Sequence, residues 1–316
     1  MSAKLVLFVF VAILFGSSLE LMQLSGAVSA ENQKEDAEIR KILYGEPSNI
    51  KQCLNVSMSR KTGIKINETE LDKPLWTVVI LKEEIILKDK IINIQQCTGS
   101  LINTQVVLTA THCTYNKTKN ELKVRAGEGT FQQERRIRQV IYQNKKKYNI
   151  TMPMKDIALI FLKTRFDHSP HVRTICLLPK PVQKIAPNVQ CFVTGWVKKA
   201  QDKPGCNFKK IAMSTIRRDR CEQVLRLTGL GGEFELDKSF MCAGGDFDKG
   251  ALDVYGGAPL VCPICGSSGI MAQVGVMSWG FKTPPLPEVL TSISSAHSWI
   301  VNQLKRKKFK LPDCGI

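Results

Sequence analysis

The stretch Leu108-Thr109-Ala110-Thr111-His112-Cys113 is the most informative part of this sequence. Two other stretches follow it in order, Asp156-Ile157-Ala158-Leu159 and Gly256-Gly257-Ala258-Pro259-Leu260-Val261-Cys262. A His beside a Cys, or an Asp that opens a strand, is by itself more often structural than chemical. The occurrence of all three stretches in this order is what indicates the fold.

Short β-rich runs surround these stretches from Pro74 onward. Gly, Asn, Asp and Pro separate the runs at roughly ten-residue spacing, which favours an antiparallel barrel or sandwich over alternating β-α units. The expected strands are Trp76–Leu81, Gln105–Leu108, Leu122–Val124, Ile137–Tyr142, Ile157–Leu162, Val189–Thr194, Ile211–Ile216, Leu260–Val261, Ala272–Met277 and Val289–Ile293. A short amphipathic helix is expected over Ala296–Leu304.

Composition limits the class of protein. The chain has 316 residues, a net charge of +17, 43% apolar residues and 23% charged residues. These values exclude a disordered, collagen-like or coiled-coil chain and fit one large or two small globular domains. Eleven Cys indicate an oxidising compartment, and their odd number leaves at least one unpaired or bonded to another chain.

The amino-terminal segment predicts secretion. Lys4 precedes the apolar run Leu5–Phe15, which is too short to span a bilayer and is typical of a signal peptide over residues 1–30 that ends at Val28-Ser29-Ala30. Residues 31–72 are polar and form an extension without a core. No other apolar segment is long enough to cross a membrane. N-glycosylation sequons lie at Asn55, Asn67, Asn116 and Asn149.

With further motifs included, the chain resembles the trypsin-like (chymotrypsin family) serine proteases. The additional motifs are Cys97-Thr98-Gly99-Ser100-Leu101-Ile102, Thr194-Gly195-Trp196, Met241-Cys242-Ala243-Gly244-Gly245 and Ser278-Trp279-Gly280. The resemblance covers residues 73–304. It implies an all-β fold of two six-stranded antiparallel β-barrels with a cleft between them and a short C-terminal helix.

The resemblance places His112 at the general base, Asp156 at the orienting carboxylate and Gly256 at the nucleophile. Glycine has no hydroxyl to attack a carbonyl, so the chain is expected to be a pseudoprotease with no catalytic residues. A displaced serine at Ser267 or Ser268 is the alternative, but both lie past Cys262 on a different turn.

Other positions depart from the family pattern as well. Tyr255 replaces the Asp that pairs with a new amino terminus, and Leu252 and Thr283 replace the disulfide beside the substrate pocket. Gly250 gives the pocket floor no charge, and Glu288 replaces a pocket-wall Gly and is expected to fill the slot. The pocket is therefore expected to be altered throughout.

His112 and Asp156 remain, and two explanations are open. A buried hydrogen-bonded imidazole and carboxylate stabilise a fold without any chemistry. Metal binding is the alternative, but it lacks a third ligand at a useful spacing. No metal or cofactor is expected.

The resemblance also implies the disulfide pairings Cys97 with Cys113, Cys191 with Cys262, and Cys221 with Cys242. Cys53 with Cys176 is similar to the bridge of insect clip-type serine protease homologues, although a clip module is not expected, because only Cys53 precedes the protease-like region. Cys206 and Cys265 are left to pair with each other, and Cys314 is unmatched.

The excess of positive charge is the last functional clue. Residues 305–316 are expected to leave the domain as a basic tail, in which Lys305, Arg306, Lys307, Lys308 and Lys310 contact a polyanion. A merely solvated surface is the alternative. Nucleic acid is not expected as a partner of a secreted chain with few interleaved aromatics.

Two functions are therefore expected. The first is a secreted inactive homologue that acts by binding, as cofactor, decoy or regulator of an extracellular protease cascade. Its partners would be proteases, zymogens or other homologues. The second is a basic effector that binds acidic glycans or anionic microbial surfaces.

Overall fold

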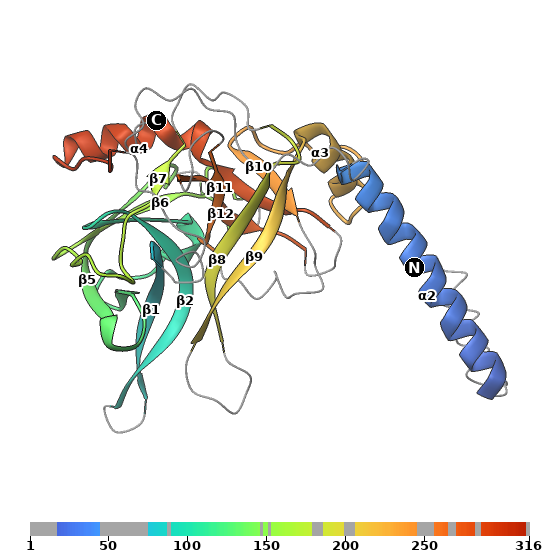
Figure 1. The fold of residues 1–316 in the computed structure, drawn as a ribbon, viewed down its shortest axis with the longest axis horizontal. Helices are drawn as coiled ribbons and strands as arrows, with labels where there is room; N and C mark the ends of the chain where they lie inside the picture. The colour runs from blue at the N-terminus through green and yellow to red at the C-terminus, as the bar shows by residue number, and fades with distance from the viewer. Residues whose placement is uncertain are drawn as a thin grey trace.

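Two β-barrels form the body of the protein, and a long helix extends from one of them (Figure 1). The computed structural model describes residues 18–44, 75–86, 90–145, 148–150, 153–178, 186–198, 206–244, 256–264, 270–281 and 286–313. Everything below concerns these residues.

The first barrel is a closed ring of six antiparallel strands in the order β1-β2-β3-β6-β5-β4. Pairing of β1 with both β2 and β4 closes the ring, which leaves no unpaired edge. Its strands are β1 (Thr77–Ile86), β2 (Lys90–Asn103), β3 (Val106–Thr109), β4 (Leu122–Ala126), β5 (Gln133–Tyr142) and β6 (Ala158–Leu162).

The second barrel has the strand order β11-β8-β9-β10-β13-β12, and a pairing between β11 and β12 closes it. Strand β7 (Cys176–Leu177) adds to β12 in parallel. The other strands are β8 (Gln190–Lys198), β9 (Cys206–Ile216), β10 (Phe240–Gly244), β11 (Pro259–Pro263), β12 (Met271–Trp279) and β13 (Glu288–Ser292). The predicted fold of two six-stranded barrels is confirmed.

Every strand expected from the sequence overlaps a strand of the structure, but β2, β7 and β10 were not expected. Strand β2 carries polar residues that are buried because distant segments satisfy them. The Gln95 side chain donates to the Trp196 carbonyl at 2.7 Å, and Ser100 Oγ donates to Gln273 Oε1 at 2.6 Å. These bonds join the two barrels and allow polar residues in the core.

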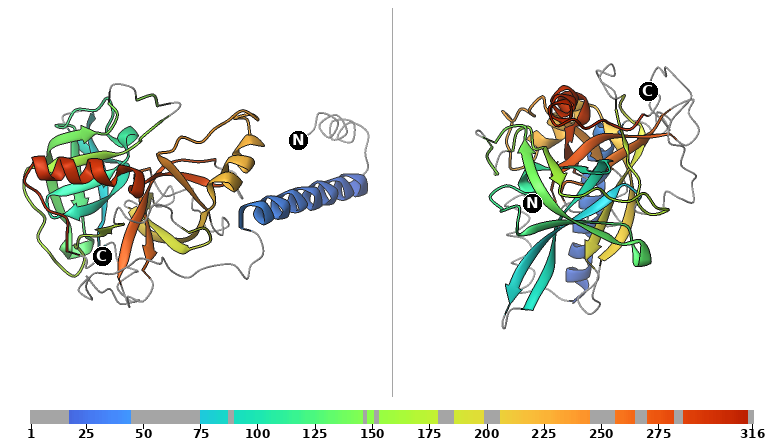
Figure 2. Two further views of the ribbon diagram at one scale, coloured as in Figure 1. Left: turned by 90° about the horizontal axis from the view of Figure 1, so that it is seen from above. Right: turned by 90° about the vertical axis from the view of Figure 1, so that its left-hand side faces the viewer.

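The helices lie outside the barrels. They are α2 (Ser18–Tyr44), α3 (Arg218–Arg226) and α4 (Ile293–Arg306), with short 3-10 turns η4 (Thr111–Cys113) and η5 (Gly129–Phe131). Helix α4 buries Ile293, Ala296, Ile300 and Leu304 along one face, as expected of an amphipathic helix. It leaves the second barrel and lies across the first (Figure 2).

The segment after α4 stays on the first barrel, so the expectation that it leaves the domain is wrong. The Phe309 ring packs against Phe161, with 5.5 Å between centroids, and Asn103 Nδ2 donates to the Lys310 carbonyl at 2.7 Å. Apolar contact for Phe309 outweighs the freedom of a solvated tail. Residues 305–308 and Lys310 are nevertheless exposed, as expected.

Helix α2 runs through the predicted cleavage site and ends against the second barrel. Leu43 is buried with Cys221 and Val224 of α3, and Asn188 Nδ2 donates to the Tyr44 carbonyl at 3.0 Å. The polar extension therefore contacts the barrel domain through its first residues. No helix among the described residues is long and apolar enough to cross a membrane.

Candidate functional site

His112 and Asp156 meet at one end of the first barrel because their strands are neighbours. Strand β3 pairs antiparallel with β6, with Thr109 opposite Ala158, so residues just after β3 lie beside residues just before β6. The His112 Nδ1–H donates to Asp156 Oδ2 at 2.7 Å, and its backbone N–H donates to Oδ1 at 3.0 Å. The pair that the sequence singled out is thus in direct contact.

The Asp156 carboxylate is fully buried and accepts two more hydrogen bonds, from Tyr148 Oη at 3.1 Å and Ser278 Oγ at 2.5 Å. Burial by itself would raise the pKa of Asp156, but the hydrogen bonds from His112 and Ser278 outweigh it and hold the pKa below its usual value. The carboxylate is therefore ionised and fixes the orientation of the imidazole.

Gly256 lies directly opposite the imidazole. A Cβ built on Gly256 would lie 2.6 Å from Cε1 of His112 and would overlap Nε2. Real Cβ contacts are essentially never this short, so the ring occupies space that a side chain at position 256 would need. The neighbouring Gly257 has φ +82°, which only glycine adopts without strain.

No metal site is formed by the one cluster of metal-type side chains among the described residues. Cys97, His112 and Cys113 lie close together. The two sulfurs are bonded to each other in the Cys97–Cys113 disulfide, so neither is a free thiolate ligand.

Glu288 is the one altered pocket residue that the structure describes. Its side chain is buried, and its carboxylate lies where a Cβ on Gly280 would be placed. Burial raises the pKa of Glu288 to about 7, since no described donor or cation contacts the carboxylate. Gly250, Leu252, Tyr255 and Thr283 lie outside the described residues, as do Ser267 and Ser268.

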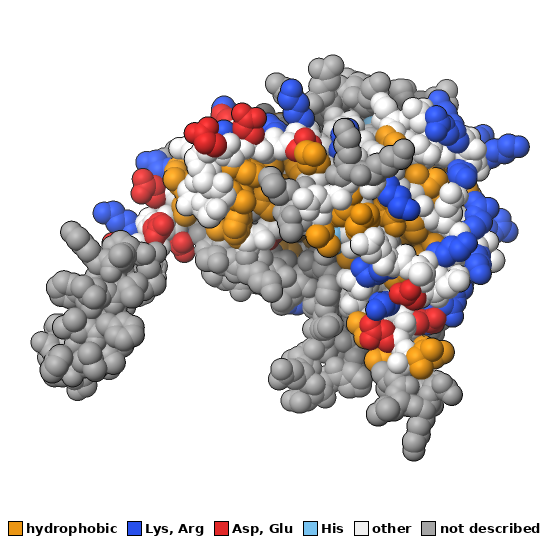
Figure 3. Space-filling model, turned by 180° about the vertical axis from the view of Figure 1, so that it is seen from behind, with side chains coloured by type: hydrophobic (Ala, Val, Ile, Leu, Met, Phe, Trp, Pro, Cys, Tyr) orange, Lys and Arg blue, Asp and Glu red, His pale blue; other side chains and the backbone are white. Residues whose placement is uncertain are grey.

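A groove of about 770 Å³ runs from His112 along the second barrel. Ile150, Met154 and Leu230 in its wall are exposed to 65%, 42% and 41%, a degree unusual for large apolar side chains. Phe234, Phe240 and Trp279 also line the groove, and Trp279 meets each of the two Phe rings edge to face. Figure 3 shows a band of hydrophobic side chains across one face of the molecule.

Three disulfides join Cys97 to Cys113, Cys191 to Cys262, and Cys221 to Cys242, as the resemblance implied. Cys176 is also disulfide-bonded. Its proposed partner Cys53 lies outside the described residues, as do Cys265, Cys314 and the side chain of Cys206. Asn116 and Asn149 are exposed, and Asn55 and Asn67 lie outside the described residues.

A family model described as Trypsin matches residues 83–300. The chain belongs to the trypsin family. The structure brings together the three residues that the resemblance predicts for the triad positions, His112, Asp156 and Gly256.

Insect proteins are among the similar relatives. Phenoloxidase-activating factor 2 of Galleria mellonella is 35% identical over 76% of this chain and 84% of its own length. Two Anopheles gambiae proteins, inactive CLIP domain-containing serine proteases A28 and A8, are 31% and 32% identical over 75% and 64% of this chain. The chain spans 64% and 57% of the lengths of these two relatives.

Two residues of the site were missed by the sequence reasoning. Tyr148 has no recognisable signal, because a Tyr between a lysine run and a sequon has no special spacing. Ser278 lies in the Ser-Trp-Gly motif, which indicated the family but not a bond to Asp156. The structure shows that both donate to the same buried carboxylate.

Proposed function

We propose that this protein is a secreted, catalytically inactive serine protease homologue that acts by binding, as a cofactor, decoy or regulator of an extracellular protease cascade. The observation that carries the proposal is the contact between His112 and Gly256, where an imidazole faces a residue without a hydroxyl. An open groove with apolar walls lies beside this contact, and such a groove supports a function in binding.

Acyl transfer by a triad needs a nucleophile whose proton the imidazole removes. Gly256 supplies none, and loss of the nucleophile alone can reduce the rate by about 10⁶. Asp156 still accepts four hydrogen bonds, so its retention follows from stability and does not argue for catalysis.

The groove beside His112 has the character of a recognition surface. Exposed apolar side chains in a concave site favour protein partners, and Lys117, Glu235 and Asp237 give the groove a polar rim. An extended segment of a protease or zymogen fits this combination, because such a chain buries apolar side chains and satisfies its backbone at the rim.

The names of the relatives support an active protease or a zymogen as the class of partner. Two of them are named as inactive serine proteases and one as a phenoloxidase-activating factor. An activating factor without a nucleophile would have to work through an active protease or its zymogen. Signal-peptide features and disulfides support secretion, since disulfides persist in oxidising compartments.

A comparison of two variants tests the proposal. Ile150→Ser with Leu230→Ser alters the groove, and Ile85→Ser alters an apolar side chain that is 74% exposed elsewhere. Each protein is used to capture partners from extracellular fluid, and captured proteins are identified by mass spectrometry. We expect the wild type and Ile85→Ser to capture a trypsin-family protease or zymogen and the groove variant to lose it. Equal capture by all three, or steady hydrolysis of peptide substrates by the wild type, would overturn the proposal.

A further inference from the structure

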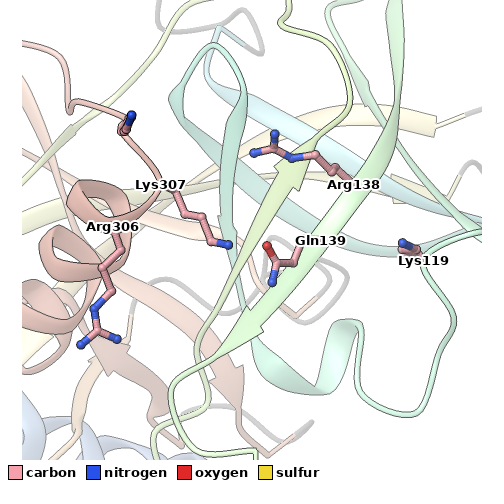
Figure 4. Close-up of a pocket in the computed structure, with 6 residues that line it drawn as sticks. Lys119, Arg138, Gln139, Arg306 and Lys307 are labelled. Carbon is pink, nitrogen blue, oxygen red and sulfur yellow. The ribbon is translucent and has the colours of Figure 1, made fainter.

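A second surface lies at the far end of the first barrel, where the end of α4 meets strand β5. A groove of about 490 Å³ is lined there by Lys119, Arg138, Gln139, Arg306, Lys307 and Lys308. Figure 4 shows Lys307, Arg138 and Gln139 facing the same space, with Arg306 and Lys119 on its two sides. Five of the six lining side chains are cations, and none is a carboxylate.

The cations of the groove have no acidic partners among the described residues, in contrast to their neighbours on the same barrel. Arg125 pairs with Glu134 at 2.6 Å, Arg136 with Glu83 at 2.5 Å, and Lys123 with both carboxylates. Arg138 lies only two residues from Arg136 on β5. The barrel thus pairs one group of cations with carboxylates and leaves the other without them, although Arg138 lies over the Phe309 ring, 5.9 Å from its centroid.

Lys308 gives a second, independent indication. Its φ is +61°, and it follows the end of α4 at the position where glycine is preferred. The Phe309 N–H donates to the Leu304 carbonyl at 2.9 Å and closes the helix in this geometry. A lysine is therefore held in a conformation that glycine would adopt with less strain, which favours a role for its charge.

We propose that the groove between the C-terminal end of α4 and strand β5 binds a sulfated polysaccharide, with Lys119, Arg138, Arg306, Lys307 and Lys308 contacting its sulfate groups. The proposal does not depend on the protease-cascade function. The partial negative charge at a helix C-terminus also favours cations, and this attraction explains why Lys305 and Arg306 occupy the last turn of α4. It does not account for Lys119 and Arg138, which belong to other segments.

The chemistry of the groove favours a polysaccharide over other polyanions. None of the large exposed apolar side chains among the described residues lines it, so it lacks the apolar anchors that insert into a lipid surface. It also lacks aromatic side chains in its lining for stacking on bases. A flexible chain with repeated sulfates can follow a line of cations through charge attraction alone.

Heparin is the probe for the first experiment, with the full secreted chain. A groove variant combines Arg138→Gln, Arg306→Gln and Lys307→Gln. The control variant combines Arg125→Gln, Arg136→Gln and Arg217→Gln, which removes the same charge from cations that are paired with carboxylates. Lys123 remains to compensate Glu83 and Glu134 in the control. Thermal unfolding verifies that both variants are folded.

We expect the groove variant to bind heparin about 100-fold more weakly at 0.15 M salt, or about fivefold per cation, and the control to change less than about threefold. Equal losses in both variants would show that only the net charge matters and would overturn the proposal. An unchanged groove variant would overturn it too.

Lys308→Gly provides a separate readout. We expect it to weaken heparin binding about fivefold while raising the unfolding temperature, because it removes a charge and relieves the left-handed backbone. Desulfated heparin should not compete for binding. Competition by anionic lipid vesicles or an acidic protein, but not by dextran sulfate, would assign the surface to a different partner and contradict the proposal.

Discussion

Nε2 of His112 occupies the space in which a side chain at position 256 would begin. The imidazole is held there by Asp156, which accepts from Nδ1 at 2.7 Å. The glycine at position 256 and the placement of the ring therefore depend on each other. A new side chain at position 256 requires the ring to move and its bond to Asp156 to break or bend.

We expect the wild type to show no hydrolysis of peptide or ester substrates and no labelling by serine-directed phosphonates, because Gly256 has no hydroxyl, and we expect Gly256→Ser to show little activity. The overlap with His112 should lower the free energy of unfolding by about 1–3 kcal/mol. Gly256→Ala should have the same effect on stability, and Gly232→Ser, which meets no atom within 4 Å, should have almost none. Urea unfolding measures all three, and an active Gly256→Ser enzyme would contradict the expectation.

Asp156→Asn should destabilise the protein, because Asp156 is buried and accepts four hydrogen bonds. The Asn amide has only one oxygen and cannot accept the four hydrogen bonds that the carboxylate accepts. Its NH2 group would point at groups that are themselves hydrogen-bond donors. We expect the free energy of unfolding to fall by about 2–4 kcal/mol. Ser278→Ala removes one donor from the charged carboxylate and should cost about 1.5 kcal/mol, less than Asp156→Asn. Similar stability of Asp156→Asn and the wild type would show that the buried network contributes little.

Glu288 should make the stability of the fold depend on pH. Its pKa is raised by burial from an ordinary value near 4.5 to about 7, so the unfolded chain ionises at a lower pH than the folded one. The contribution of this group to stability is full below about pH 4.5 and falls as pH rises to about 7, by about 3 kcal/mol in total.

Glu288→Gln removes this ionisation and serves as the reference. We expect the wild type to lose about 3 kcal/mol relative to Glu288→Gln between pH 4.5 and pH 8, measured by urea unfolding at both values. A difference between the two proteins that stays constant with pH would mean that the carboxylate is solvated or paired in the folded state.

Phe309→Ala tests whether the chain after α4 is packed on the barrel. Loss of its contact with Phe161 should lower the free energy of unfolding by about 1–2 kcal/mol, less than for a fully buried Phe because Phe309 is half-buried. Leu227→Ala, at a side chain that is 68% exposed, is the control and should have no effect. Equal stabilities would indicate a solvated tail.

We expect Cys176 to be bonded to Cys53. A proteolytic cut between Arg60 and Gly63 would then leave the two pieces joined until a reductant is added. Cys176 does form a disulfide in the structure. Non-reducing electrophoresis and disulfide mapping by mass spectrometry test the pairing, and pieces that separate without reductant would show that Cys176 has another partner.

Local sequence predicted most strands but not β2, and the reason is physical. Gln95, Thr98 and Ser100 do not form an alternating apolar pattern, yet they are buried. Gln95 and Ser100 find hydrogen-bond partners in the second barrel, more than 100 residues away. A polar strand residue of this kind cannot be assigned to a core until its distant partner is known.

The sequence by itself determined the family, the disulfides shared with it and the absence of a hydroxyl at Gly256, because these depend on residue identity and motif order. Only the tertiary structure decided where the imidazole of His112 rests and that Phe309 holds the last segment on the barrel. It also decided which cations stay unpaired. Arg136 and Arg138 are alike in the sequence, but the closure of the barrel brings Glu83 to the first and the end of α4, with its own cations, to the second. Charge compensation depends on distances between segments far apart in the chain, and folding alone sets those distances.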